Sequence, residues 1–178
     1  MLSIHDPNWA TEFIALKAVL AETLGSLALD IVHVGSTAIP DLLAKPILDI
    51  DVVMRAYSEF PAIIGALQTL GYEHAGDQGI HEREAFRAKG IAPDVPRAAG
   101  WMPHHLYVCP VQGRELQRHV RFRDVLRQHE GLRREYEVIK QSIAARAGGD
   151  RRHYAEIKER ECREFVERVL QLPEQPAA

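Results

Sequence analysis

The sequence predicts one α+β domain, in which helices lie at both ends of the chain and strands lie in its middle. The chain has 178 residues and 46% of them are apolar, which is enough for one hydrophobic core. Apolar residues recur at helical spacing near the start and again from residue 114 onward, whereas β-rich runs lie between these segments. This order predicts a mixed sheet packed by helices, with a helical C-terminal third.

The first half of the chain is expected to contain two helices and the first strands. Asp6-Pro7 marks the start of a helix, because an Asp side chain accepts bonds from free amides and Pro fits the first turn. Gly25 ends this helix, and Gly35-Ser36 ends the strand that follows it. The predicted elements are a helix over 6–25, strands over 27–34 and 47–54, a helix over 58–70 and a strand beginning at 71–74.

The second half is expected to be irregular at first and then helical. A stretch rich in Pro and Gly between residues 90 and 100 predicts a loop, and Pro110 ends a later strand. We expect a single domain over residues 1–172 and a disordered tail over residues 173–178. The predicted elements are strands near 83–88 and over 104–109, then helices from 114 with breaks near 130–131 and 148–149.

Composition and charge exclude several classes of protein. No apolar run is long enough to span a bilayer, and the N-terminus lacks the pattern of a signal peptide. Neither of the two cysteines, Cys109 and Cys162, belongs to a CxxC pair, so we expect a cytoplasmic, reducing setting. A net charge of −3 gives no strong signal for nucleic acid. The chain also lacks the GxxxxGK[ST] loop, so a kinase of the P-loop type is a poor interpretation.

The strongest local signal combines Gly35-Ser36 with Asp49 and Asp51. Side chains two residues apart in a strand point to the same face, so the two carboxylates project together. Their mutual repulsion is relieved by a divalent cation, and Mg²⁺ is typically held by one or two carboxylates plus substrate phosphates. The Gly-Ser turn supplies amides and a hydroxyl for phosphate oxygens. The alternative is that both carboxylates line a solvated strand face, and the nearby Gly-Ser pair favours the metal site.

Two residues near this acidic pair are further candidates. Lys45 comes just before the acidic strand and is placed to neutralise phosphate, although a solvated loop lysine explains it equally well. His105 and Tyr107 share one face of a later strand, whereas His104 faces the other side. If that strand lies beside the acidic strand, His105 can serve as a metal ligand or a proton-transfer group. A structural histidine is the alternative.

The basic and aromatic residues give weaker signals. Arg83 lies in a non-helical segment and is kept as a candidate phosphate ligand. Most C-terminal arginines have a Glu at helical spacing, so surface ion pairs explain them. Tyr154 and Lys158 share a helix face, where they offer a ring for stacking and a charge for phosphate. A core tyrosine with a surface lysine is an equally good interpretation.

These segments together resemble the signature of the GrpB family, also called UPF0157. The resemblance extends over nearly the whole chain. It is carried by residues 31–40, 44–50, 83–86, 104–108, 122–127 and 136–140, and by Asp150, Arg151, Tyr154 and Lys158.

The GrpB family is similar to the nucleotidyltransferase superfamily, which has a polymerase-β-like fold. The resemblance implies that Gly35 and Ser36 contact a triphosphate and that Asp49 and Asp51 hold Mg²⁺ or Mn²⁺. A full transferase adds a third carboxylate from a later strand, where the metals stabilise the attacking and leaving oxygens. This sequence departs from that pattern, because the candidate strand carries His105 and Tyr107 instead of an acid.

We therefore predict a Mg²⁺-dependent nucleotidyltransferase that moves a nucleoside monophosphate group from a nucleoside triphosphate to an unknown small acceptor. The alternative is a non-catalytic module for nucleotide or metal binding, or for folding assistance, that lacks the third carboxylate. A weaker possibility is a metal-dependent phosphohydrolase that uses the same carboxylates. The residues expected to act are Asp49, Asp51 and His105 for catalysis and metal, and Gly35, Ser36, Lys45, Arg83, Tyr154 and Lys158 for the nucleotide.

Overall fold

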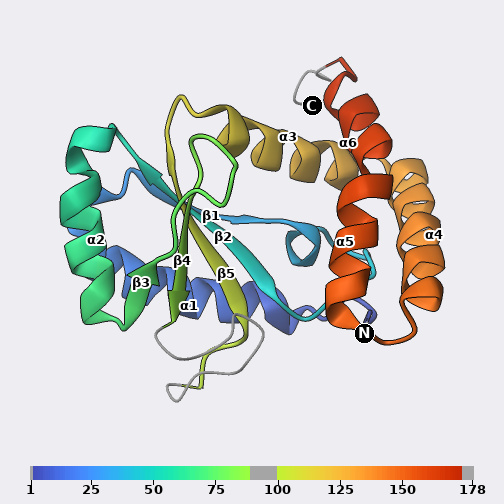
Figure 1. Ribbon diagram of the computed structural model, residues 1–178, viewed down its shortest axis with the longest axis horizontal. Helices are drawn as coiled ribbons and strands as arrows, with labels where there is room; N and C mark the ends of the chain where they lie inside the picture. The colour runs from blue at the N-terminus through green and yellow to red at the C-terminus, as the bar shows by residue number, and fades with distance from the viewer. Residues whose placement is uncertain (1, 89–99, 174–178) are drawn as a thin grey trace.

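The structure is a computed structural model that describes residues 2–88 and 100–173 (Figure 1). Its elements follow the predicted order closely, and the α+β class with a helical C-terminal third is confirmed. In chain order they are α1 (Asn8–Leu24), β1 (Asp30–Val34), β2 (Leu48–Met54), α2 (Phe60–Thr69), β3 (Tyr72–His74), β4 (Glu84–Ala88), β5 (His104–Pro110), α3 (Arg114–Gln128), α4 (Glu130–Ala147), α5 (Arg151–Glu161) and α6 (Arg163–Leu170).

The five strands form one mixed sheet in the order β1-β2-β5-β4-β3. Strand β2 is antiparallel to β1 and parallel to β5, and β4 is antiparallel to both β5 and β3. The parallel pair aligns Asp49 with His105 and Asp51 with Tyr107. Strands β2 and β5 therefore lie side by side in the centre of the sheet, as the interpretation of His105 required.

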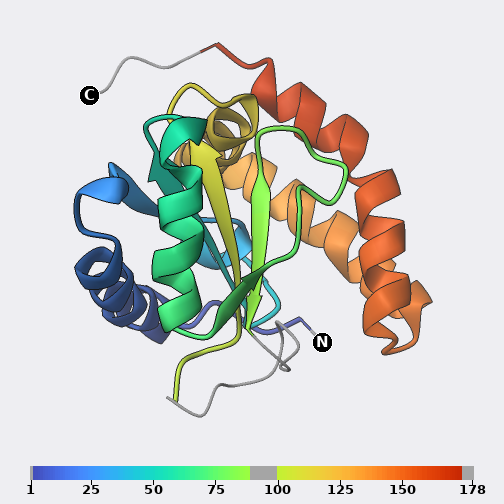
Figure 2. The same ribbon diagram turned by 60° about the vertical axis from the view of Figure 1, so that its left-hand side comes forward.

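Helices cover both faces of the sheet, and the strand alternation decides which residues each face buries. On one face, Leu48, Ile50 and Val52 are buried in a core cluster with residues of α1 and α2. On the other face, α3 covers a smaller cluster that includes Val53 and Cys109. Figure 2 shows α1 and α2 on one side of the molecule and α4 to α6 on the other.

Helices α3 to α6 enclose a second large cluster, which also buries two residues of the loop between β1 and β2. These loop residues are Ile39 and Leu42, and both have no exposed surface. Hydrogen bonds fasten the same loop to the helices: Glu137 on α4 accepts from the Leu43 amide at 2.7 Å, and Arg127 on α3 donates to the Ala38 carbonyl. The loop that precedes β2 is thus held by the C-terminal helices.

Several element boundaries differ from the sequence-based expectation. The first strand begins at Asp30 instead of residue 27, because a 3₁₀ turn over Gly25–Leu27 follows α1. The C-terminal helical segment has an additional break at Cys162, which the helical periodicity did not indicate. The predicted loop over 90–100 and tail over 173–178 lie almost entirely outside the described residues. Among the described residues, no helix is long and apolar enough to cross a membrane.

Candidate functional site

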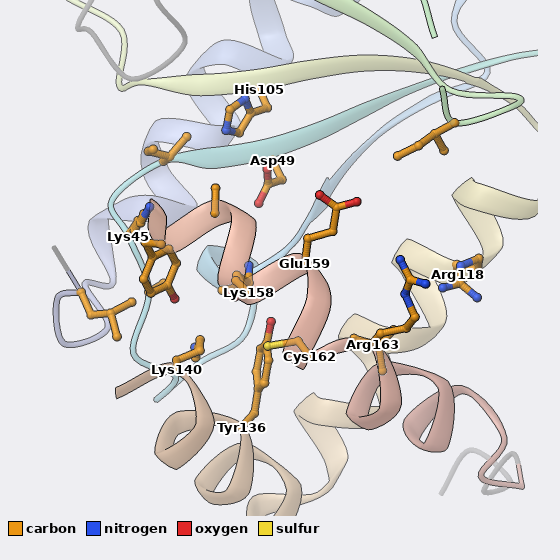
Figure 3. Close-up of a pocket in the computed structure, with 18 of the residues that line it drawn as sticks. Lys45, Asp49, His105, Arg118, Tyr136, Lys140, Lys158, Glu159, Cys162 and Arg163 are labelled. Carbon is orange, nitrogen blue, oxygen red and sulfur yellow. The ribbon is translucent and has the colours of Figure 1, made fainter. Parts of the chain in front are cut away.

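A cavity of about 640 Å³ lies between the sheet and helices α3 to α6. It opens where β1 ends and where β2 and β5 begin, so the turn after β1 and the first residues of β2 and β5 form one wall. Helices α4, α5 and α6 form the opposite wall (Figure 3). Six residues singled out from the sequence line this cavity: Ser36, Lys45, Asp49, His105, Tyr154 and Lys158.

Gly35 and Asp49 are in direct contact at this wall. The antiparallel register of β1 and β2 places Val34 opposite Asp49, and Gly35 then turns over the carboxylate with a φ of 71°. A β-carbon on Gly35 would lie 2.0 Å from Asp49 Oδ2, so only glycine fits both the backbone angle and the space. The turn leads directly to Ser36, which lines the cavity.

His105 and His104 have different environments, as strand alternation predicted. His105 is partly exposed in the cavity wall. It is the residue of β5 that pairs with Asp49 of β2. His104 is buried on the other face, where its Nδ1 donates to the Met102 carbonyl at 2.8 Å. The Tyr72 hydroxyl therefore donates to His104 Nε2, at 2.6 Å. His104 is a structural residue of the core, whereas His105 faces the cavity.

Three lysines from different elements give one end of the cavity a positive charge. Lys45 precedes β2, Lys140 lies on α4 and Lys158 lies on α5. The Lys45 ammonium is 4.0 Å from the centre of the Tyr154 ring, so the cation covers part of the ring that was expected to stack on a base. Figure 3 shows Lys45 and Lys140 at the same end of the cavity, with Lys158 beneath Asp49.

Lys140 was not identified from the sequence as a site residue, yet only 1% of it is exposed and it lines the cavity. Its Nζ donates to the Leu43 carbonyl and lies 4.6 Å from the centre of the Tyr136 ring. Burial and the charge of Lys158 lower the pKa of Lys140 from its ordinary value of 10.5 to about 7. A lysine on a helix gives no sequence signal of this burial.

Lys158 and Tyr136 are electrostatically coupled at the centre of the cavity. The phenol of Tyr136, followed by Tyr154 and Asp49, raises the pKa of Lys158 above its ordinary value despite its burial. Burial raises the pKa of Tyr136, and Lys158 opposes that shift. Lys158 therefore stays a cation at neutral pH, and it lines the cavity.

Gly35, Asp51 and Arg83 were also predicted for the site, but they do not line the cavity. Asp51 has no exposed surface, and its Oδ2 accepts a hydrogen bond of 2.8 Å from Nδ1 of His119 on α3. The Arg83 guanidinium lies 4.4 Å from the centre of the Tyr107 ring. Gly35 thus contacts the wall residue Asp49, Asp51 is buried against His119, and Arg83 packs on Tyr107.

The sequence interpretation missed His119, the hydrogen-bond partner of Asp51, because nothing in a polar helical segment marks a histidine as the partner of a distant Asp. Burial opposes the protonation of His119, but its hydrogen bond with Asp51 and the charges of Asp51, Asp49 and Glu115 raise its pKa above the ordinary value of 6.5.

The other end of the cavity carries both signs of charge. Arg118 on α3 forms ion pairs with Glu167 at 2.8 Å and with Glu115 at 3.2 Å. Glu159 and Arg163 lie close to this end in Figure 3. The sequence interpretation assigned such residues to surface ion pairs and did not connect them with a cavity. The two ends therefore differ: one is basic, and the other combines acids and bases.

Comparison with known proteins identifies relatives along the whole chain. The family model described as "GrpB protein" matches residues 1–171. A UPF0157 protein of Pseudomonas aeruginosa is 33% identical over 165 residues, which are 93% of this chain and 64% of that protein. A UPF0157 protein of Bacillus subtilis is 30% identical over 142 residues, which are 80% of this chain and 39% of that protein. The chain thus spans less than two thirds of the length of these relatives.

Solved structures show the same fold. The conserved protein GrpB from Enterococcus faecalis superimposes with a TM-score of 0.80 at 24% identity, covering 96% of this chain and 98% of that one. Cid1 poly(U) polymerase with MgGTP bound gives a TM-score of 0.52 at 14% identity and covers 80% of this chain and 44% of that one. These similarities establish a nucleotidyltransferase-like fold. The ligand and the reaction have to be inferred from the residues of this chain.

Proposed function

This chain belongs to the GrpB family, and we propose that it binds a nucleoside triphosphate with Mg²⁺ in the cavity and transfers the nucleoside monophosphate group to a small acceptor. The observation that carries the proposal is the meeting of Ser36, Asp49 and the lysines in one cavity. A carboxylate beside a group of lysines matches a ligand with several negative charges and a bound cation. The MgGTP held by Cid1, which shares the fold, supports the same class of ligand.

The lysine-rich end of the cavity is the proposed triphosphate site. Lys45 and Lys158 each supply a positive charge, and the Ser36 hydroxyl supplies a hydrogen-bond donor. Lys140 fits this role too, since a phosphate beside it favours its charged form and offsets the burial that lowers its pKa.

The donor atoms near Asp49 fit a magnesium ion that substrate phosphates complete. Asp49 and Asp51 offer carboxylate oxygens on one face of β2, and Asp51 Oδ1 is buried without a hydrogen-bond partner in the described part of the chain. Within residues 2–88 and 100–173, no group of three or more His, Cys, Asp or Glu is arranged to hold a metal. We propose Asp49 and Asp51 as the carboxylate ligands of the metal, and His105, which pairs with Asp49 in the register, as a third ligand or a proton-transfer group.

In the proposed reaction the acceptor oxygen forms a bond to the α-phosphorus, and the bond from that phosphorus to the β-bridging oxygen breaks. Pyrophosphate leaves with the bonding electron pair, and Lys45 and Lys158 neutralise its charge. His105, partly exposed beside Asp49, takes the proton of the acceptor hydroxyl. A bound Mg²⁺ supplies Lewis-acid stabilisation of the phosphoryl oxygens.

The structure also favours a second candidate, a non-catalytic nucleotide-binding module. The strand beside β2 presents His105 and Tyr107 at the register positions of Asp49 and Asp51, where a third carboxylate would stand in a full transferase. A protein with this arrangement keeps the phosphate contacts while losing part of the stabilisation of the transition state.

Calorimetric titration with ATP, GTP, CTP and UTP, with and without Mg²⁺, tests both candidates. The wild type is compared with Asp49→Asn, and Asp30→Asn serves as the control, because Asp30 begins β1 and pairs with Lys17 on the surface. We expect Mg²⁺-dependent binding that Asp49→Asn abolishes and Asp30→Asn preserves. Pyrophosphate release with a mixture of small alcohols and amines then supports the transferase, whereas tight binding without release supports the module. Absence of binding to all four nucleotides overturns both.

A further inference from the structure

The two oxygens of the Asp51 carboxylate have different surroundings. Oδ2 accepts the hydrogen bond of 2.8 Å from His119 Nδ1, whereas Oδ1 is buried without a hydrogen-bond partner among the described residues. Burying a carboxylate in this way is costly unless a cation or a donor compensates its charge. The structure thus shows one oxygen held in place and one oxygen left for a further ligand.

The ring of His119 is fixed from several sides. Glu115 lies one turn earlier on α3, with its Oε2 3.9 Å from His119 Nε2, and the Tyr107 ring lies 6.4 Å from the imidazole between centres. Leu116 anchors the same part of α3 on the sheet in a buried cluster with Cys109. One quarter of the His119 side chain is exposed, so it lies between the buried Asp51 and the surface.

We propose that His119 is a positioning residue that holds Asp51 so that Oδ1 faces the metal shared with Asp49. The inference rests on the proposed function, because it assumes that the two carboxylates bind a divalent cation. Carboxylate ligands of metals are generally held by such outer hydrogen bonds, and loss of an outer partner weakens metal affinity by about 10- to 100-fold. In this proposal both carboxylates of the metal site come from β2, and His119 on α3 supplies the outer hydrogen bond to one of them.

Three substitutions at position 119 separate positioning from packing. Asn places an amide N–H at the same distance from Cβ as His Nδ1, so His119→Asn can keep the bond to Asp51. Leu has nearly the same shape as Asn but donates nothing, and Gln carries its amide one bond further away, near the place of Nε2. Asn and Gln both carry a polar amide and differ by one methylene, which moves the donor away from the place of Nδ1.

The experiment measures Mn²⁺ binding by electron paramagnetic resonance in the presence of ATP, for the wild type, the three variants and Asp51→Asn. Urea unfolding of each protein measures folding separately. We expect His119→Asn to bind Mn²⁺ almost as tightly as the wild type. His119→Gln and His119→Leu should bind about tenfold more weakly or worse. If His119→Leu does not fold, the comparison between Asn and Gln decides.

Two other outcomes are distinguishable. If the wild type binds Mn²⁺ and Asp51→Asn does not, but Gln and Leu at position 119 bind as tightly as the wild type, the positioning role is overturned while the proposed function survives. If the folded wild type binds no Mn²⁺ with ATP, both the metal site and the role of His119 are overturned.

Discussion

Gly35 and Asp49 approach each other so closely that a β-carbon on Gly35 would come within 2.0 Å of the Asp49 carboxylate. The contact follows from the sheet, because the β1–β2 register brings the end of one strand over the start of the other. The two residues of the Gly-Ser pair therefore have different positions. Gly35 packs against the carboxylate and allows the turn, and Ser36 lines the cavity.

The first prediction is that Gly35→Ala displaces the Asp49 side chain. We expect the Mg²⁺-dependent affinity for nucleotide to fall by about tenfold or more, as for other residues that orient a metal ligand. Gly35 has a φ of 71° and a ψ of −170°, a conformation that is essentially restricted to glycine, so alanine there adds about 1–3 kcal/mol of backbone strain. Calorimetry measures the affinity, and urea unfolding measures the stability.

Gly71→Ala is the matched control. Gly71 has a similar φ of 79°, but a β-carbon there meets no atom within 4 Å and the residue is outside the cavity. Both variants place an alanine at a positive φ, and only Gly35→Ala adds a clash with Asp49. Equal losses of affinity in both would show that the effect of Gly35→Ala does not depend on the contact with Asp49.

The second prediction concerns Lys45. Lys45→Gln removes a positive charge from the basic end of the cavity while keeping a long polar side chain. A charged hydrogen bond to phosphate contributes about 1.5–3 kcal/mol, so the affinity for triphosphate should fall roughly 10- to 100-fold. Lys17→Gln is the control, since Lys17 forms a surface ion pair with Asp30. A Lys45 variant with unchanged affinity would place the triphosphate elsewhere.

The local patterns predicted which side chains share a face of the sheet, but they did not predict how deeply each side chain is buried. Strand alternation places Asp49 and Asp51 on one face, and that holds in the structure. Alternation does not reveal that helix α3 covers only one of them. Asp49 lines the cavity, whereas Asp51 is fully buried against His119. Burial of a polar residue depends on tertiary packing, and the alternation of side chains along a strand gives no information about that packing.

Residues brought in by the C-terminal helices were the hardest to predict. Lys140 and Leu43 meet although 97 positions separate them, and the segment around Lys140 shows only helical periodicity. Tyr154 and Lys158 were singled out because they share a helix face, but that spacing did not predict that they line one cavity with Lys45 and Lys140. Arg83 was kept as a candidate phosphate ligand because it lies in a non-helical segment, and in the structure its guanidinium packs on the Tyr107 ring. Local patterns thus selected candidate residues without giving their tertiary partners.

The third prediction is a pH dependence of stability caused by Lys140. Its pKa is about 7 in the folded protein and about 10.5 when exposed, so the unfolded chain binds more protons between these values. The free energy of unfolding should therefore rise as the pH increases from 7 toward 10. The expected gain between pH 7 and pH 9 is about 2 kcal/mol.

Lys140→Met isolates this contribution. The variant loses the hydrogen bond to the Leu43 carbonyl, which changes its stability by a constant amount, but it also loses the titrating amine. Urea unfolding at pH 7 and pH 9 should show a smaller rise in the variant than in the wild type, whereas Lys17→Met should retain the full rise. An identical rise in all three proteins contradicts the assignment.

The fourth prediction is proton uptake when nucleotide binds. At pH 8 the Lys140 amine is mostly neutral in the free protein, and a phosphate nearby raises its pKa and favours the charged form. Calorimetric titration at pH 8 in buffers of different ionisation enthalpy should therefore reveal uptake of a fraction of a proton. Lys140→Met should lose this uptake. Binding by the wild type without proton uptake would show that phosphate does not approach Lys140.

The last prediction is that the domain unfolds as one cooperative unit. The question arises because the cavity lies between two separately buried clusters. The cluster on the sheet contains Trp9, and Trp101 packs against it. These are the two tryptophans of the chain. The second cluster lies among α3 to α6 and contains Ile143, which has no exposed surface. We propose that both unfold together, since Glu137 and Lys140 hold Leu43 from α4 and Arg123 on α3 donates to the His33 carbonyl at 2.9 Å.

Tryptophan fluorescence reports the sheet cluster, and far-ultraviolet circular dichroism reports mainly the helices. If the domain is one cooperative unit, the two signals follow the same urea transition in the wild type. Ile143→Ala should destabilise the second cluster by about 2–5 kcal/mol and shift both transitions equally. A shift of the dichroism alone would show that the helices unfold separately. The cavity would then join two independent units, and ligand binding should restore the coincidence of the transitions by linking its two walls.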